Sequence, residues 1–215
     1  KQWFTTTVAE LLSKVWTRSG PGWSQEELFE GAHPVLFANY LTPAMDDDTP
    51  PRYEMVSDWD KLQRTLKGAL DDYNIINPNK MNLVFFRDAV EHLSRIARVL
   101  RQPRGNAMQI GVGGSGKQSL TRMACSLADM EVFTIELTRG YDLVAFREDM
   151  KGLMMRAGGE GRSIAFLFTD SQIVNEGFLE DINNMLNTGE IPSLFEQDEV
   201  NKVCEDVRPI AQAKG

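Results

Sequence analysis

One stretch of nine residues constrains this chain more than any other: GVGGSGKQS, residues 111–119. It follows the phosphate-binding pattern of Gly, four residues, Gly and Lys. In that pattern the glycines let successive backbone N–H groups point into one concavity, and the lysine reaches the β- and γ-phosphates of a nucleotide. The helix that follows adds its positive N-terminus. The candidate nucleotide-binding residues are therefore Gly111, Val112, Gly113, Gly114, Ser115, Gly116, Lys117, Gln118 and Ser119.

The segments around this loop alternate between strand and helix patterns. Apolar segments predict strands at 107–111, 132–137 and 163–168. Helical patterns follow them at 117–130, 143–158 and 178–189. This order predicts an α/β fold, a P-loop NTPase with a parallel sheet and flanking helices. We expect the sheet to be incomplete, because a P-loop sheet normally has two more strands and no strand pattern follows Phe168.

Gln118 departs from the phosphate-binding pattern, which places a Ser or Thr after the lysine so that a compact hydroxyl holds the magnesium of the nucleotide. A glutamine side chain is longer and neutral, and its amide oxygen reaches the metal only in a different geometry. Ser119 has a hydroxyl, but one residue further along a helix turns it about 100° away. We therefore expect weakened magnesium coordination at Gln118; the alternative is a tolerated variant in a normal ATPase.

A second departure follows the apolar run that ends at Phe168. Hydrolysis at a P-loop needs an Asp after this strand to support magnesium, commonly with a Glu beside it to polarise the attacking water. In one register Thr169 replaces the Asp and Asp170 replaces the Glu. In the other, Asp170 holds the metal and Ser171 stands where the base belongs. Asp170 is the candidate catalytic and metal residue, and Gln118 the second metal candidate, unless Asp170 only caps the next helix.

The part of the chain before the loop is mainly helical. Residues 1–33 predict a helix with buried aromatic and apolar side chains such as Trp3 and Leu11, and the apolar segment 33–41 either adds a strand or docks on a neighbour. A Pro- and Asp-rich connector follows. From Trp59, leucines at spacings of four predict an amphipathic helix, and a second one is expected from about Leu83 to Leu100.

Composition narrows the function classes. The net charge is −8, which argues against a surface that neutralises nucleic-acid phosphates. No apolar run approaches the roughly 20 residues of a membrane-spanning helix. Cys125 and Cys204 form no metal-ligand spacing and are expected to be packing thiols, and His33 and His92 have no partner at metal spacing. We expect neither a nucleic-acid nor a membrane partner.

Five further segments give the chain a specific resemblance: residues 100–124, 147–158, 166–173, 178–199 and 208–215. Together with the P-loop they resemble the fourth AAA+ module of dynein heavy chains. Gln118 and the pair Thr169-Asp170 resemble the axonemal branch of ciliary and flagellar dyneins, whereas cytoplasmic dyneins tend to keep Lys-Thr and Asp-Glu at these positions. The likeness covers most of residues 34–215.

The resemblance implies a parent protein that is an ATP-dependent microtubule motor of the cilium or flagellum axoneme, in the cytoplasm and its cytoskeleton. Its partners would be the neighbouring AAA+ modules of the same chain, the microtubule, and dynein intermediate and light chains. Residues 1–33 would end the preceding module, 34–60 would be a connector, and 61–215 a partial AAA+ large subdomain. The resemblance also implies an adenine pocket lined in part by Leu83, Val84 and Phe85; a plain core role for these three is the alternative.

Three roles remain open for the module. In the first, the module binds ATP or ADP, with Mg²⁺ weakly held, in a regulatory or structural role with weak or no hydrolysis. In the second, it is an active ATPase module. In the third, it is a nucleotide-free scaffold of the ring. The intact Lys117 and the four glycines argue against complete loss of binding. The two departures on the metal side argue against full activity. We therefore expect binding with little or no turnover.

Overall fold

The computed structural model describes residues 2–15, 36–42 and 51–213, in two units that span residues 1–68 and 69–215. The first unit contains α1 (Gln2–Val15) and a short antiparallel pair, β1 (Phe37–Ala38) and β2 (Glu54–Met55). The apolar segment at 33–41 thus does supply a strand. The prediction that Trp3 and Leu11 are buried is wrong, because both side chains are exposed. His33 lies outside the described residues.

Helix α3 (Trp59–Ile76) begins in the first unit and ends in the second, and it confirms the helix predicted from Trp59. Its leucine stripe is buried at Leu62, Leu66 and Leu70. In the last turn of the helix, the Asn74 side chain donates to the carbonyl of Met81 at 2.9 Å and accepts from the N–H of Met81 at 2.7 Å, which holds the segment that follows the helix.

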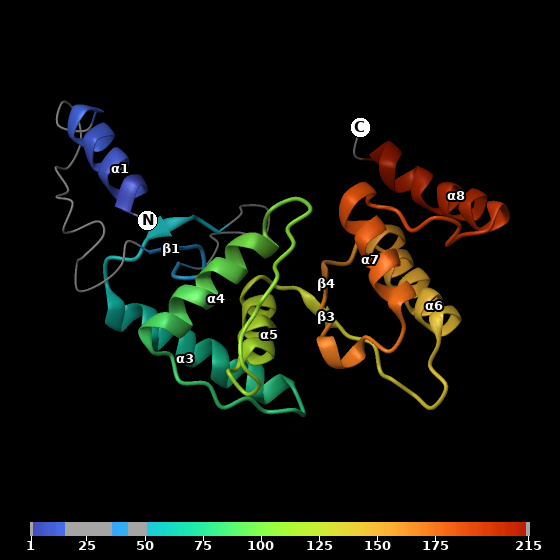
Figure 1. Cartoon of the computed structure of the whole chain (residues 1–215), viewed down its shortest axis with the longest axis horizontal. Coiled ribbons are helices and arrows are strands. Elements are labelled where there is room, and N and C mark those ends of the chain that lie inside the picture. The colour runs from blue at the N-terminus through green and yellow to red at the C-terminus, as the bar shows by residue number, and fades with distance from the viewer. Residues whose placement is uncertain (1, 16–35, 43–50, 214–215) are drawn as a thin grey trace. The chain divides into compact units, whose positions relative to one another are not determined.

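In the second unit, α4 (Arg87–Leu100) packs against α5 (Lys117–Leu127), the helix that follows the phosphate loop (Figure 1). Apolar spacing on α4 buries one face, from Ala89 to Ala97, as expected for an amphipathic helix. The predicted start at Leu83 is wrong by four residues. Phe86 has an extended backbone and is the N-cap of the helix, so residues 83–86 lie before it without regular secondary structure.

A parallel pair of strands, β3 (Glu131–Phe133) and β4 (Ile164–Phe166), lies beside the other helices. These are α6 (Leu143–Met154), which continues as the π-helix η2 (Met155–Gly159), α7 (Glu176–Thr188) and α8 (Gln197–Ala213). The core here is apolar and aromatic: the Phe146 and Phe178 rings stack with centroids 4.4 Å apart. Asp181 of α7 is 2% exposed and accepts two 2.8 Å hydrogen bonds from Arg147 of α6.

The strand predicted at 107–111 does not form: within the described ranges the paired strands are β1–β2 and β3–β4. The segment has no regular secondary structure, and its alternate side chains Met108, Ile110 and Val112 are 88%, 89% and 79% exposed. A strand forms only when its N–H and C=O groups pair with a neighbour, so the apolar pattern alone cannot complete it. This segment nevertheless leads directly into the loop.

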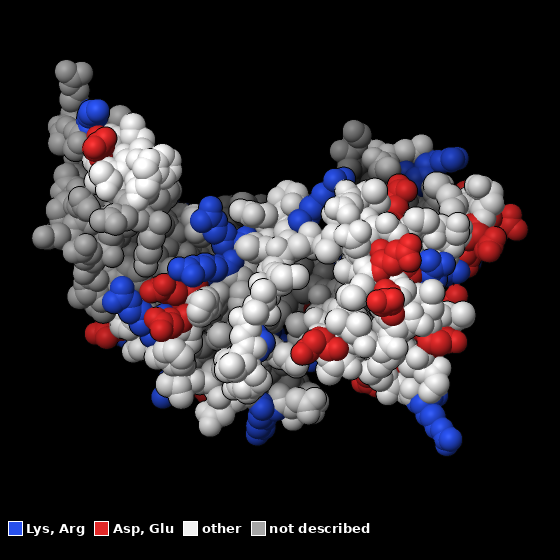
Figure 2. Space-filling view, viewed as in Figure 1, with Lys and Arg blue, Asp and Glu red and all other residues white. Residues whose placement is uncertain are grey.

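The surface of this unit is acidic over its C-terminal helices. On the face shown in Figure 2, Asp and Glu side chains gather over α6, α7 and α8. Lys151 of α6 binds Glu199 of α8 at 2.9 Å, which raises the pKa of the lysine and lowers that of the glutamate. None of the described helices is long and apolar enough to cross a membrane.

The two cysteines differ. Cys125 lies fully buried in α5, where desolvation raises its pKa to about 11, as expected for a packing thiol. The expectation is wrong for Cys204, which is exposed on α8.

Candidate functional site

The phosphate loop curls as its glycines allow. Gly114 and Gly116 adopt φ of +73° and +77°, a left-handed conformation that costs an L-residue about 1–2 kcal/mol. Gly116 is the N-cap of α5, so the helix begins at Lys117, directly after the loop. The first N–H groups of a helix have no intrahelical acceptor and attract an anion. A Cβ at Gly113, Gly114 or Gly116 would find no atom within 4 Å, so the loop leaves open space for a ligand.

Lys117 lies over its own loop. Its ammonium donates to the carbonyls of Gly111 and Val112 at 2.8 and 2.7 Å, and to the hydroxyl of Ser115 at 3.3 Å. These three contacts match the three donors of an ammonium group. The donor is charged in both cases, but an anionic phosphate oxygen also attracts the ammonium as an opposite charge, which a neutral carbonyl does not. The lysine can therefore exchange loop oxygens for phosphate oxygens.

A cavity of about 830 Å³ opens beside the loop, within the roughly 300–1,000 Å³ of small-molecule sites. Of the predicted nucleotide-binding residues, those that line it are Leu83, Val84, Gly111, Val112, Gly114, Ser115, Gly116 and Lys117. Those that do not are Phe85, Gly113, Gln118 and Ser119. The structure thus brings the segment before α4 to the same cavity as the loop, with Phe86 in the place expected for Phe85.

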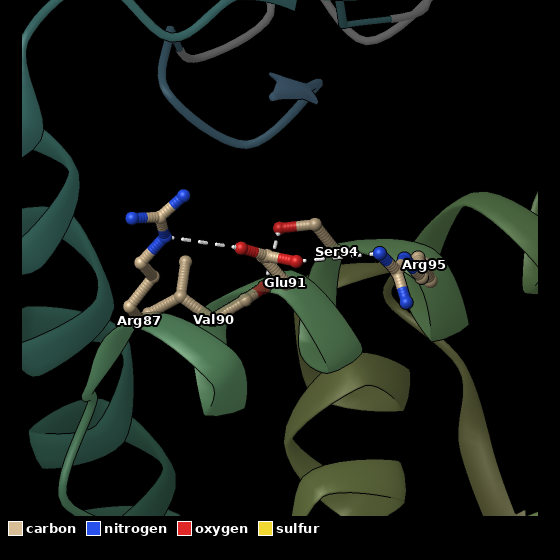
Figure 3. A network of polar contacts seen from close by, with 5 residues as sticks. All are labelled: Arg87, Val90, Glu91, Ser94 and Arg95. Carbon is tan, nitrogen blue, oxygen red and sulfur yellow. Dashed lines mark hydrogen bonds and ion pairs between the residues drawn. The ribbon is translucent and has the colours of Figure 1, made fainter. Parts of the chain in front are cut away.

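Sequence reasoning missed one wall of this cavity, formed by one face of α4. Asp88, His92, Arg95 and Val99 lie on it at spacings of three and four residues. The sequence pattern does not predict that His92 and Arg95 lie on this wall. Figure 3 shows how Arg95 is held: Glu91 lies between Arg87 and Arg95 and accepts from each at 3.3 Å. The helical spacing was visible in the sequence, but not which face meets the cavity.

The metal-side residues are arranged differently. Thr169 is the N-cap of a short 3₁₀ turn, η3 (Asp170–Gln172), and its hydroxyl bonds within that turn. Asp170 is the first residue of the turn, and its side chain is exposed. The alternative that Asp170 caps the next helix is wrong, because Asn175 caps α7 by accepting from the N–H of Gly177 at 2.8 Å. Neither Asp170 nor Gln118 lines the cavity, and Gln118 is exposed in the first turn of α5.

A second cavity, of about 670 Å³, lies between η2 and α8 and is lined largely by apolar side chains such as Met154, Phe195 and Val203. Cys204 and Arg208 are the polar side chains on its wall. It offers none of the glycine-loop backbone that binds phosphate. The cavity at the P-loop is therefore the candidate nucleotide site.

A family model described as the P-loop containing dynein motor region D4 matches residues 81–215, more than half of the chain. This chain belongs to that dynein family. The match confirms the resemblance seen in the sequence and the fold class, an incomplete P-loop (AAA+) α/β fold.

Curated relatives agree with this dynein assignment. The chain is 49% identical to Dynein axonemal heavy chain 6 of Homo sapiens over 182 residues, which are 85% of this chain and 4% of that protein. It is 43% identical to Dynein axonemal heavy chain 1 of Rattus norvegicus over the same shares. It is also 43% identical to Dynein-1-beta heavy chain, flagellar inner arm I1 complex, of Chlamydomonas reinhardtii, over 100% of this chain and 5% of that protein. The chain thus spans about one twentieth of these relatives or less.

Proposed function

We propose that this chain is a nucleotide-binding AAA+ module of an axonemal dynein heavy chain, and that it holds ATP or ADP with weak or no hydrolysis. The observation that carries the proposal is the phosphate loop. Gly114 and Gly116 take the left-handed turns, α5 begins at Lys117, and both the loop and the lysine face a cavity of about 830 Å³. Backbone N–H groups and one ammonium suit a polyphosphate.

The proposal of weak hydrolysis has its support on the metal side. Magnesium, when bound with nucleotide, neutralises charge on the phosphates and so assists transfer of the terminal phosphoryl group to water. Gln118 offers it no hydroxyl, and the Thr169 hydroxyl is bonded within its own turn. The exposed Asp170 is the one carboxylate in the predicted pair of positions. Gln118 and Asp170 would hold the metal weakly, so the module would bind nucleotide but hydrolyse it slowly or not at all.

We extend the proposal to the parent protein through the names of the relatives. The parent would be an ATP-hydrolysing microtubule motor of the cilium or flagellum axoneme, with neighbouring AAA+ modules, the microtubule, and intermediate and light chains as partners. Residues 1–33 would end the preceding module, 34–60 would connect, and 61–215 would be a partial large subdomain. Further strands of the same heavy chain would then pair with 107–111 and cover Met108 and Ile110, which are exposed here.

The test is nucleotide occupancy of this module in the intact heavy chain, measured with and without magnesium. Lys117→Ala removes the ammonium but leaves the loop glycines. We expect the affinity for nucleotide to fall about a hundredfold, and occupancy to fall with it, because several charge-assisted hydrogen bonds are lost. Chelation of magnesium is expected to change the wild-type affinity much less. Equal occupancy in the wild type and Lys117→Ala would refute nucleotide binding here.

A further inference from the structure

Gln172 is a buried residue at the end of η3, the 3₁₀ turn that follows β4. The residue is 9% exposed, and both the nitrogen and the oxygen of its side-chain amide form hydrogen bonds. Its Nε2 donates to the Thr134 hydroxyl at 2.9 Å and to the carbonyl of Ile135 at 2.7 Å. Its Oε1 accepts from the N–H and the hydroxyl of Thr169, at 2.8 and 3.1 Å. One side chain therefore joins the segment after β3 to the segment after β4.

These contacts fix which way the amide points. If the amide flipped, Oε1 would face the carbonyl oxygen of Ile135 and Nε2 would face the N–H of Thr169. Both backbone hydrogen bonds would be lost in a buried place, where each unsatisfied group costs about 1–3 kcal/mol. The Thr169 hydroxyl therefore meets an acceptor oxygen and donates to it at 3.1 Å, while the same hydroxyl oxygen accepts from the backbone N–H of Gln172 as the cap of the turn.

We propose that Gln172 is a positioning residue that clasps the ends of β3 and β4 together and selects a proton donor, rather than a carboxylate, at position 169. The inference rests on the proposed function, because it explains how this module does without the metal-supporting Asp. An ionised carboxylate at 169 has no proton and would bring an anionic oxygen to about 3 Å from Gln172 Oε1. Restoring the acid alone therefore would not restore the metal site.

The first measurement is hydrogen exchange of the segments 131–137 and 164–174 in the intact heavy chain. Thr169→Asp is expected to accelerate exchange in both segments about tenfold or more, because a half-buried carboxylate oxygen would lie against Gln172 Oε1 and repel it. Thr169→Asn is the matched control. Asparagine has the same shape as aspartate but is neutral, and its N–H₂ group can face Gln172 Oε1. We expect less than about a threefold change for it.

The second measurement is the ratio of nucleotide affinities with and without magnesium. In Thr169→Asp alone we expect this ratio to stay within about twofold of the wild type. Adding Gln172→Ala removes the opposing oxygen and frees the carboxylate for the metal, so the ratio should rise about fivefold or more. A merely structural role for Gln172 would change stability without changing the magnesium ratio.

Two results would overturn the proposal: equal exchange in Thr169→Asp and Thr169→Asn, or a rise in the magnesium ratio in Thr169→Asp as large as in the double variant. These outcomes differ from a failure of the proposed function, in which Lys117→Ala leaves occupancy unchanged. The exchange measurement tests the clasp even in that case, because it needs no bound nucleotide.

Discussion

The loop at 111–119 and the turn at 169–172 both follow apolar segments that were predicted to be strands, yet their polar groups are arranged in opposite ways. Lys117 bonds three oxygens of its own loop, and the glycines around it face open space. Gln172 has all its hydrogen bonds inside the protein, across two chain segments. The Lys117 ammonium lies beside open space, so a ligand can replace its loop partners. The Gln172 amide is buried, so no ligand or water is at hand to replace the hydrogen bonds that it makes.

The packing beneath the two regions differs in the same way. The segment that leads into the loop exposes Met108, Ile110 and Val112, while the turn lies beside the aromatic core around Phe146 and Phe178. We expect the first region to depend on partners added to it and the second to be stable by itself. Three substitutions test this contrast.

The largest effect is expected from Phe178→Ala. This ring is fully buried and stacks on Phe146, so its removal should cost about 3–5 kcal/mol in the local stability of the β3–β4 region. Hydrogen exchange should accelerate in 131–137 and 164–174. Leu179→Ala, on the same helix and 43% exposed, is the control and should have little effect. The contrast fails if the amides of α5 accelerate as much as those of β4, because the two regions would then unfold together.

A smaller effect is expected from Gly116→Ala. A Cβ there has space but requires φ near +77°, so the cost is torsional, about 1–2 kcal/mol. It should appear as roughly tenfold faster hydrogen exchange in the first turns of α5, measured without nucleotide. Gly113→Ala is the matched control for this stability measurement, because Gly113 has equal space and no positive φ. Equal protection in both variants would show that the start of α5 does not depend on the left-handed turn.

The same contrast explains what could be predicted from the sequence. Helices α3, α5, α6 and α7 and strands β3 and β4 were predicted because each depends on a local period or a short apolar run. The strand predicted at 107–111 does not form, since a strand needs a neighbour to pair with. The start of α4 moved because the extended backbone of Phe86 caps the helix at that point.

The candidate site divides in the same manner. The loop residues and Lys117 could be named from spacing, because the motif is contiguous. Gln172 could not, because its bonds to Thr134 and Ile135 join residues 38 and 37 positions apart. Arg95 was missed for a related reason: its place on the cavity wall depends on how α4 packs on α5, which no local pattern reports.

The smallest effect is expected from Arg95→Gln. This guanidinium lies on the wall of the cavity that contains Lys117, but its side chain is 68% exposed, so solvent screens its attraction for phosphates. We expect nucleotide affinity to fall about threefold, with a difference that shrinks as salt is added. Arg87→Gln is the matched control, because Arg87 binds the same Glu91 at the same 3.3 Å distance but does not line the cavity. If both variants lose affinity equally, the effect arises from releasing Glu91, and α4 then acts on the site through its ion pairs rather than through the charge that faces the nucleotide.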